Sequence, residues 1–354
     1  MTVTGKRPHR KKYDMNKSIE LTDGEFHYSF GYYSQNKWID DKRVVLIRSL
    51  SPDISSLDGN FTTELVIFDT ESGEIIPIAW GVNTWCDYVV GENRVFYIKG
   101  DSLLKLDILT GETKEIFEEN GIGSPHITAD GKYLSVFRCK PEISSFWRIE
   151  IDTGASKKLL DKAFAEPFPY ANHGMISPKD ENKIFFSHEG NTRYITNRLW
   201  LYDDSKKLDF NIARQRLGKN GELIDCYGHE CWSHDGKGLY FVKYRESEAP
   251  RGICYVDIET GEQRLLFSGY DYWHVSASYS ERYIAADTRN LGGNKSGVVL
   301  IDLKNGEEKM IDTVSTTFKH PCHPHPQISP NQRKIIYHFS NDRKKCCVRV
   351  ANLL

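Results

Sequence analysis

Residues 65–78 read LVIFDTESGEIIPI, in which an alternating apolar run leads through an aspartate and a glycine-containing turn into a second short run. This order is typical of a β-hairpin, because alternation buries one face of each strand and the polar turn reverses the chain. The pattern recurs as LLKLDILTGETKEI (103–116), WRIEIDTGASKKLL (147–160), ICYVDIETGEQRLL (253–266) and VVLIDLKNGEEKMI (298–311), with LWLYDDSKKLDFNI (199–212) as a degenerate copy. Such recurrence indicates a repeat architecture.

A second hairpin unit alternates with the first and places a small polar turn ahead of an apolar run. Its copies are ITADGKYLSVF (127–137), ISPKDENKIFFS (176–187), WSHDGKGLYFV (232–242), SASYSERYIAA (276–286) and ISPNQRKIIYH (328–338). Two hairpins make four strands, and a repeat of roughly 40 residues has the size of a four-stranded propeller blade. With a final unit at 328–353, the sequence predicts an all-β fold, a seven-bladed β-propeller with four-stranded antiparallel blades.

The repeats are expected to form a single domain over residues 1–354, since no linker or low-complexity stretch interrupts them. Residues 1–30 precede the first clear blade, and SIELTD (18–23) is a candidate for the strand that closes the ring with the seventh blade. The longest irregular insert, residues 204–226, separates the hairpins of blades four and five.

Composition excludes several classes of protein. The 39% hydrophobic content supplies a large core, which excludes a disordered chain and a miniprotein held by disulfides. The 47 lysines and arginines nearly balance the 49 aspartates and glutamates, so the chain has no overall positive charge that would attract nucleic acid or an anionic membrane. No apolar run approaches the ~18 residues of a membrane span, and no apolar stretch follows the basic start. The eight cysteines lack paired spacing, so we expect reduced thiols and a cytoplasmic location.

Four of the 12 histidines occupy one equivalent position in successive blades. When the blades are aligned on their turns, this position holds His173, His229, His274 and His325, with Ser124 in blade three. Two further histidines, His320 and His323, precede His325 in an H-x-x-H-x-H cluster. Because the segments that enter the innermost strands of a propeller meet around its axis, these side chains are expected to gather at one mouth of the central channel.

Gathered histidines favour a metal site, since imidazole is the commonest protein ligand for transition metals. In extended chain, His323 and His325 send both rings to the same side. The simpler interpretation, that histidines satisfy hydrogen bonds in the core, suits an isolated residue better than four in register. For the strand end at His188 and Glu189, with Arg198 opening the next strand, a structural salt bridge and a functional role are equal alternatives.

An ordered set of motifs carries a resemblance to a known family. The motifs are GHECWSHDG (228–236), HPHP (323–326) followed by ISP, SHEG…NRLW (187–200) and FHYSFGYY (26–33). Together they resemble the oligogalacturonate lyases of polysaccharide lyase family 22, over most of the chain. The resemblance implies a cytoplasmic seven-bladed propeller that cleaves short oligogalacturonates, the breakdown products of pectin, by β-elimination with a bound divalent ion, commonly Mn²⁺.

The resemblance also implies roles for individual residues. The metal ligands would be His274, His323 and His325, the general base would be His229 and its arginine partner Arg198. His320 stands where the family has a glutamine ligand, and we count it as a fourth metal ligand. The substrate-binding residues expected from their place at the mouth are His173, His188 and Glu189.

Two alternatives stay open at the level of sequence. The family motif HEGP reads HEGN at 188–191, and the stretch between Arg198 and His229 is longer than in the family, so another uronate-containing oligosaccharide is a second candidate substrate. A non-enzymatic propeller scaffold of the TolB or WD-repeat kind shares the same hairpins, but has no reason to line a channel mouth with metal ligands.

Overall fold

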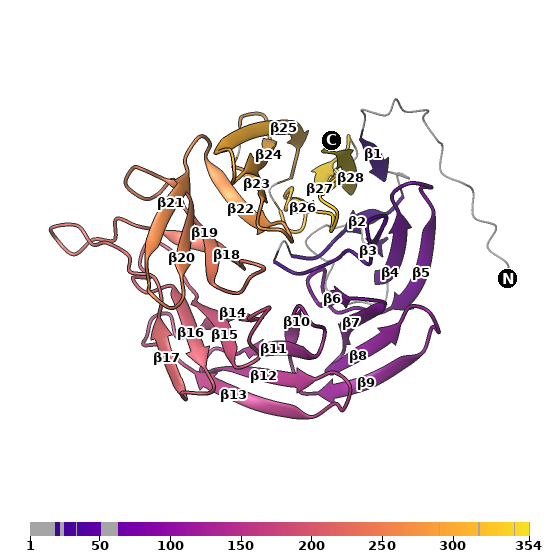
Figure 1. Cartoon of the computed structure of the whole chain (residues 1–354), viewed down its shortest axis with the longest axis horizontal. Coiled ribbons are helices and arrows are strands. Elements are labelled where there is room, and N and C mark those ends of the chain that lie inside the picture. Colours follow the sequence, from indigo (N-terminus) through magenta and orange to yellow (C-terminus); the bar gives the residue numbers. More distant parts are fainter. Residues whose placement is uncertain are drawn as a thin grey trace.

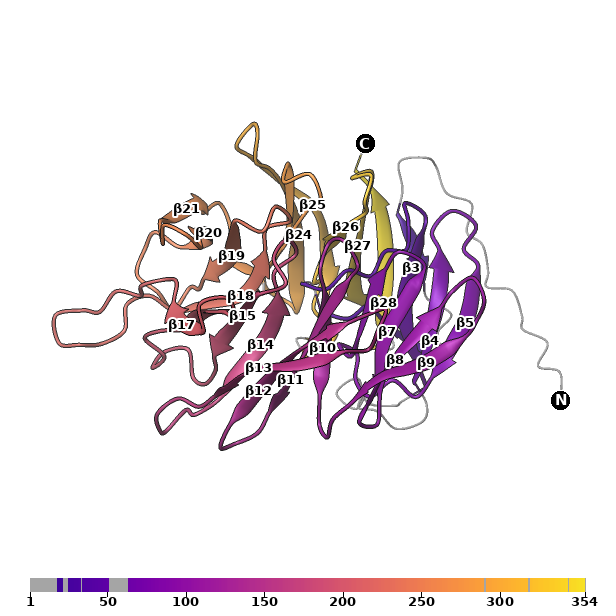
Figure 2. The same ribbon diagram turned by 60° about the horizontal axis from the view of Figure 1, so that its bottom comes forward.

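The computed structural model describes residues 18–21, 25–32, 34–50, 63–289, 291–317, 319–342 and 344–353. Seven antiparallel sheets of four strands stand around a central axis as the blades of a propeller (Figure 1), and the side view shows them inclined to one another (Figure 2). The predicted fold class is confirmed. Among the described residues, no helix has the length and apolar character needed to cross a bilayer.

The strands of each blade follow one another outward from the axis (Figure 1). Blade 1 comprises β2 (His27–Ser29), β3 (Arg43–Ser49), β4 (Thr63–Asp69) and β5 (Ile75–Trp80). Blade 2 comprises β6 (Tyr88–Gly91), β7 (Arg94–Lys99), β8 (Ser102–Asp107) and β9 (Thr113–Glu118). Blade 3 comprises β10 (Gly123–Ile127), β11 (Tyr133–Cys139), β12 (Ser144–Glu150) and β13 (Ser156–Lys162). Blades 4 and 5 comprise β14 (Ala171–Ile176), β15 (Lys183–His188), β16 (Leu199–Asp203), β17 (Leu208–Asn211); and β18 (Tyr227–Trp232), β19 (Gly238–Lys243), β20 (Gly252–Asp257), β21 (Gln263–Phe267). Blades 6 and 7 comprise β22 (Tyr272–Ala277), β23 (Tyr283–Thr288), β24 (Lys295–Asp302), β25 (Glu307–Ser315); and β26 (Gln327–Ile328), β27 (Lys334–Ser340), β28 (Cys346–Asn352), β1 (Ile19–Leu21).

The two ends of the ring are joined within blade 7. β1 pairs antiparallel with β28, with Ile19 opposite Val350 and Leu21 opposite Val348. The first described strand of the chain is therefore the outermost strand of the last blade (Figure 1). This pairing covers the free edge of β28, which would otherwise expose unpaired backbone groups. Blade 1 begins at β2, so its innermost strand lies inside the first 30 residues.

The turns that mark the repeat have a common chemistry. In the turn from β4 to β5, the Asp69 carboxylate accepts two backbone N–H groups, at 2.8 and 2.7 Å, and Gly73 donates its N–H to the Asp69 carbonyl at 2.9 Å. Gly73 has φ 75°, a left-handed conformation that glycine adopts without steric cost. In the degenerate copy of blade 4, Lys207 takes this place with φ 54°. The aspartate and the turn, rather than glycine alone, therefore define the repeat.

The core lies between the blades. Each gap between neighbouring blades holds one cluster of buried side chains drawn from both sheets. In β3, Val44 and Leu46 face blade 7, whereas Val45 and Ile47 face blade 2. Successive side chains of a strand point to opposite faces, so a continuous apolar run fills two gaps at once. This packing fixes the blades side by side and sets the positions of the segments that enter β10, β14, β18 and β22.

Candidate active site

A β-bulge recurs in the innermost strands of blades 3 to 6, at β10, β14, β18 and β22. At the equivalent position, Ser124, His173 and His229 of blades 3 to 5 have φ values of 48°, 55° and 54°, and His325, which precedes β26 of blade 7, has φ 42°. Non-glycine residues at positive φ cost about 1–3 kcal/mol each and collect at functional sites, where a bulge re-aims a side chain. The strain therefore marks these positions independently of their residue types.

The histidine side chains at these positions lie close to one another. The ring centroid of His274 lies 4.1 Å from that of His229 and 4.1 Å from that of His325. Tyr32 places its ring edge-on to both His173 and His325, at 5.5 and 5.7 Å. The gathering of the histidines at one mouth of the channel, which the alignment of the blades predicts, is confirmed.

His274, His323 and His325 form a buried group whose candidate ligand nitrogens all lie within 4.8 Å of one another. The Nε2 atoms of His274 and His325 are 3.1 Å apart. Burial, followed by the neighbouring histidines, lowers the pKa of both His274 and His325 well below the ordinary value, so both imidazoles are neutral as metal ligation requires. Three converging imidazoles fit a divalent transition metal.

Asp287 of β23 supports this group from behind. Nδ1 of His274 lies 2.9 Å from Oδ2 of Asp287, and the carboxylate also accepts the backbone N–H groups of His274 and His325 at 2.8 and 3.0 Å. A carboxylate in this place holds the Nδ1–H tautomer and leaves Nε2 to bind a metal. Burial raises the pKa of Asp287 to about 7, and a cation held by His274 would favour its ionised form.

His320 lies beside the three histidines without belonging to their group. Its ring centroid is 4.5 Å from that of His323, and the ring stacks on Trp85 with centroids 5.3 Å apart. Trp85 also stacks on His325, at 5.7 Å. His320 is exposed whereas the other three are buried. The structure thus places His320 at the outer edge of the cluster, against an aromatic wall.

His229 of β18 has the tautomer and charge of a proton acceptor. Its Nδ1 lies 2.5 Å from the carbonyl oxygen of Trp273, to which it donates, so that Nε2 carries the lone pair. Burial and then the neighbouring His274 lower the pKa of His229 well below the ordinary value. The Tyr244 hydroxyl is 3.0 Å from the same Nδ1 and helps to hold the ring. A neutral imidazole of fixed orientation therefore stands next to the three-histidine group.

Arg198 is buried between two carboxylates. Its Nε donates to Oε1 of Glu230 at 2.6 Å, and its two terminal nitrogens donate to the two oxygens of Glu189, each at 3.2 Å. Burial raises the pKa of Glu230 and Arg198 opposes it, with the net result well below the usual range. His173 lies against both carboxylates, with Nδ1 3.5 Å from Glu230 and Nε2 3.9 Å from Glu189. Arg198 is thus held by protein carboxylates.

Comparison with known proteins assigns the chain to a family. The model of the oligogalacturonate lyase family matches residues 124–353. The chain belongs to the oligogalacturonate lyase family. Curated relatives are an oligogalacturonide lyase of Pectobacterium atrosepticum, 21% identical over 92% of this chain and 90% of the relative, and an oligogalacturonate lyase of Dickeya dadantii, 22% identical over 82% of each. A solved structure described as an oligogalacturonate lyase in complex with manganese has a TM-score of 0.79 at 18% identity, covering 96% of each chain.

Family membership confirms the resemblance seen in the sequence motifs and the classification as a polysaccharide lyase. The structural likeness, at this low identity, shows the fold. The insert between Arg198 and His229 forms an extension of the chain, bridged between Leu217 and Leu223, that projects from the rim between blades 4 and 5 (Figures 1 and 2).

His188, expected to bind substrate, has both ring nitrogens engaged within the protein. Nδ1 lies 2.8 Å from Oδ1 of Asn197 and Nε2 lies 2.8 Å from the carbonyl oxygen of Phe168. Its ring stacks on Phe164 with centroids 3.8 Å apart. These contacts tie the end of β15 to the segment before Arg198. Of the two interpretations of this strand end, His188 has the surroundings of a structural residue, whereas Glu189 reaches the arginine.

Two carboxylates of the site, Glu230 and Asp287, were not among the predicted site residues. Glu230 follows His229 in the motif and is fully buried, and Asp287 is the one charged residue of β23. A charge inside an apolar strand, as in YIAADT (283–288), is a signal that could have identified Asp287. Glu230 could have been noted as a carboxylate in a strand that otherwise reads as buried.

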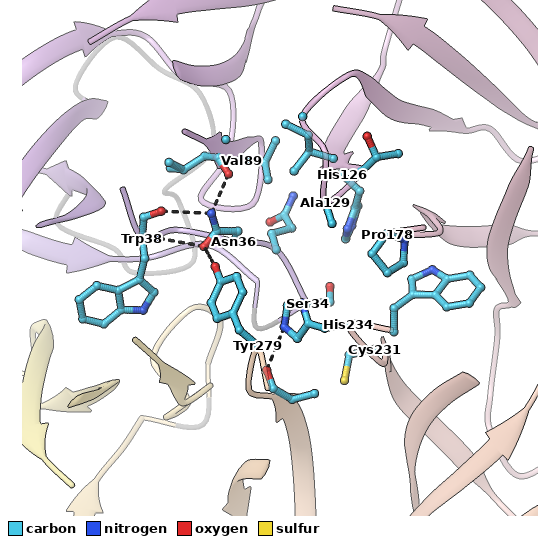
Figure 3. A pocket seen from close by; sticks show the side chains of 18 of the residues that line it. Ser34, Asn36, Trp38, Val89, His126, Ala129, Pro178, Cys231, His234 and Tyr279 are labelled. Carbon is cyan, nitrogen blue, oxygen red and sulfur yellow. Dashed lines mark hydrogen bonds between the residues drawn. The ribbon is translucent and has the colours of Figure 1, made fainter. Parts of the chain in front are cut away.

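The other mouth of the channel holds a separate cavity of about 340 Å³ (Figure 3). Its wall includes His234, Tyr279 and Pro178 from the turns that follow the innermost strands, with Asn36 accepting a hydrogen bond from Tyr279 at 2.5 Å. His234 stacks on Tyr279, with ring centroids 4.5 Å apart. None of the predicted site residues lines this cavity.

Replacing Glu230 with glutamine is expected to lower the free energy of unfolding by about 3 kcal/mol, because it leaves the buried Arg198 with one charged partner. Urea unfolding measures the change. The matched control is Asp161→Asn, which breaks the exposed 3.2 Å pair with Lys158 and should cost at most about 1 kcal/mol. Equal losses in the two variants would contradict a structural role for the Arg198–Glu230 pair.

Proposed function

We propose that this protein is a metal-dependent lyase that cleaves short oligogalacturonates by β-elimination. The observation that carries the proposal is the buried group of His274, His323 and His325, backed by Asp287, next to the neutral His229. The names of the curated relatives support the substrate class. A cytoplasmic location is also proposed, in keeping with eight cysteines that are all free thiols.

The ion would be held by His274, His323 and His325, with His320 as a fourth candidate ligand at the edge of the group. A divalent ion in this place supplies Lewis-acid stabilisation of the charge that develops on the uronate carboxylate. We propose Mn²⁺, because a structure of similar fold is described as a manganese complex.

The protein's own residues supply proton transfer. The C5 proton of the uronate is weakly acidic because it lies next to a carboxylate, and its removal is the difficult step. Nε2 of His229 accepts this proton, while the donation from Nδ1 to the Trp273 carbonyl keeps the ring oriented and helps to stabilise the imidazolium that forms. Arg198 maintains the carboxylates beside the base through Glu230, the residue that follows His229.

The test is ultraviolet absorbance of the double bond conjugated to the carboxylate in the product. The chelator-treated protein is mixed with digalacturonate, with and without Mn²⁺, and the panel is repeated with other uronate disaccharides. Restored absorbance with digalacturonate is the expected result. Absorbance with another uronate but not with digalacturonate would show that the protein is a lyase for a different substrate. No absorbance with any uronate, together with no bound metal, would favour a non-enzymatic scaffold.

A further inference from the structure

We propose that His173 is the acid that protonates the leaving glycosidic oxygen. The inference deepens the proposed function and rests on it. In a galacturonate the C5 hydrogen and the C4 oxygen lie on opposite faces of the ring, so the group that removes the proton cannot also protonate the leaving oxygen. The reaction therefore needs a second proton-transfer group apart from His229.

His173 lies among one guanidinium and two carboxylates. Arg198 contributes one positive charge, and Glu189 and Glu230 contribute two negative charges. Despite burial, Arg198 and His173 hold the pKa of both carboxyls below the usual range, so both are ionised. A net negative charge is costly to bury unless it is neutralised. An imidazolium at His173, in contact with both carboxylates, brings the cluster to neutrality.

The geometry leaves one proton of this imidazolium for the substrate. Nδ1 faces the fully buried Oε2 of Glu230 at 3.5 Å, whereas Nε2 is 3.9 Å from Glu189, beyond hydrogen-bonding distance. The His173 side chain is 19% exposed, so it reaches the channel mouth. Its strained backbone, with φ 55°, matches that of His229, with φ 54°, in the next blade. The two side chains thus enter the same mouth from neighbouring blades.

The two histidines have opposite electrostatic surroundings. His229 is packed against His274, whereas His173 is packed against two carboxylates. The two side chains therefore differ in the charge of the groups that contact them. The titratable and charged groups that surround or couple to His173 are Tyr32, His126, Glu189, Arg198, Glu230 and His320.

The step balances with these groups. His229 takes the C5 proton, the C4–C5 double bond forms, and the C4–O bond breaks with its electron pair moving to the glycosidic oxygen. The Nε2 proton of His173 passes to that oxygen, which leaves as a hydroxyl. His229 then returns its proton to water and His173 recovers one, so no oxidant or further reactant is needed.

The test uses a leaving group that needs no proton. Digalacturonate is compared with the methyl glycoside of 4-deoxy-4-fluorogalacturonate, from which the same elimination releases fluoride. In His173→Gln, kcat for digalacturonate is expected to fall by about 10²–10⁴-fold, the usual contribution of general acid catalysis, while fluoride release changes little.

The outcomes separate the two proposals. If wild-type protein converts neither substrate, the proposed function fails. If wild-type protein converts both and His173→Gln slows both equally while still binding Mn²⁺, His173 is not the acid. If His173→Gln does not fold, His173→Asn takes its place in the same comparison. The matched control is His234→Gln at the opposite mouth, which should leave both rates unchanged.

Discussion

His229→Gln is expected to lower kcat/KM for digalacturonate by about 10²–10⁴-fold, the range that general base catalysis contributes. Glutamine preserves much of the side-chain volume and a hydrogen bond to the Trp273 carbonyl, but it cannot accept the C5 proton. Affinity for Mn²⁺ should be retained, because His229 is outside the group of His274, His323 and His325. A variant that still forms unsaturated product at the wild-type rate would exclude His229 as the base.

The pH dependence follows from the same residue. Since burial and His274 lower the pKa of His229 well below its ordinary value, the ring stays unprotonated as the pH falls through about 6.5, where an ordinary histidine gains its proton. The acid fall of kcat/KM should therefore lie below that pH. A profile of initial rates over the acid range measures it, and an acid limb centred at or above the ordinary histidine value would contradict the buried neutral state.

His274→Gln is expected to weaken Mn²⁺ binding by more than ~100-fold, because changing only an outer partner of a ligating histidine costs about 10–100-fold. Titration calorimetry measures the affinity. Asp287→Asn, which leaves the imidazole in place but alters the group behind Nδ1, should give the smaller loss of about 10–100-fold. Activity in His274→Gln should fall at least ~10²-fold, the loss that accompanies removal of one stabilising group for developing charge.

The order of these losses is the test of the site. If Asp287→Asn binds Mn²⁺ as tightly as the wild type, the carboxylate does not orient His274. If His274→Gln retains wild-type affinity, the ion binds elsewhere in the protein. His234→Gln, in the separate cavity at the other mouth, is the matched histidine replacement and should bind Mn²⁺ normally.

The repeat could be predicted from the sequence because the patterns that define it are local. Asp69 and Gly73 form their turn within five residues, and the alternation in β3 assigns each side chain to one of two gaps without knowledge of the neighbours. The equivalence of His173 and His229 is likewise a matter of spacing, and the matching φ values of these two residues show that it has a backbone counterpart. Local pattern thus predicts both the blade and the position within it.

The partners of the site residues depend on how the blades pack. Arg198 and Glu230 are 32 residues apart and lie in neighbouring blades, and the clustered histidines His274 and His325 are 51 residues apart. No local sequence pattern predicts that Arg198 is surrounded by carboxylates of the protein, or that both ring nitrogens of His188 form hydrogen bonds within the protein. These facts are set by the distances between blades.

Strand alternation, turn chemistry and repeat spacing act over a few residues, so the seven blades, the channel mouth and the residue types gathered there can be predicted from the sequence. Which histidine is neutral and which faces carboxylates follows from the packing of the blades. Protonation depends on burial and on charges within a few ångströms, and those neighbours come from distant parts of the chain.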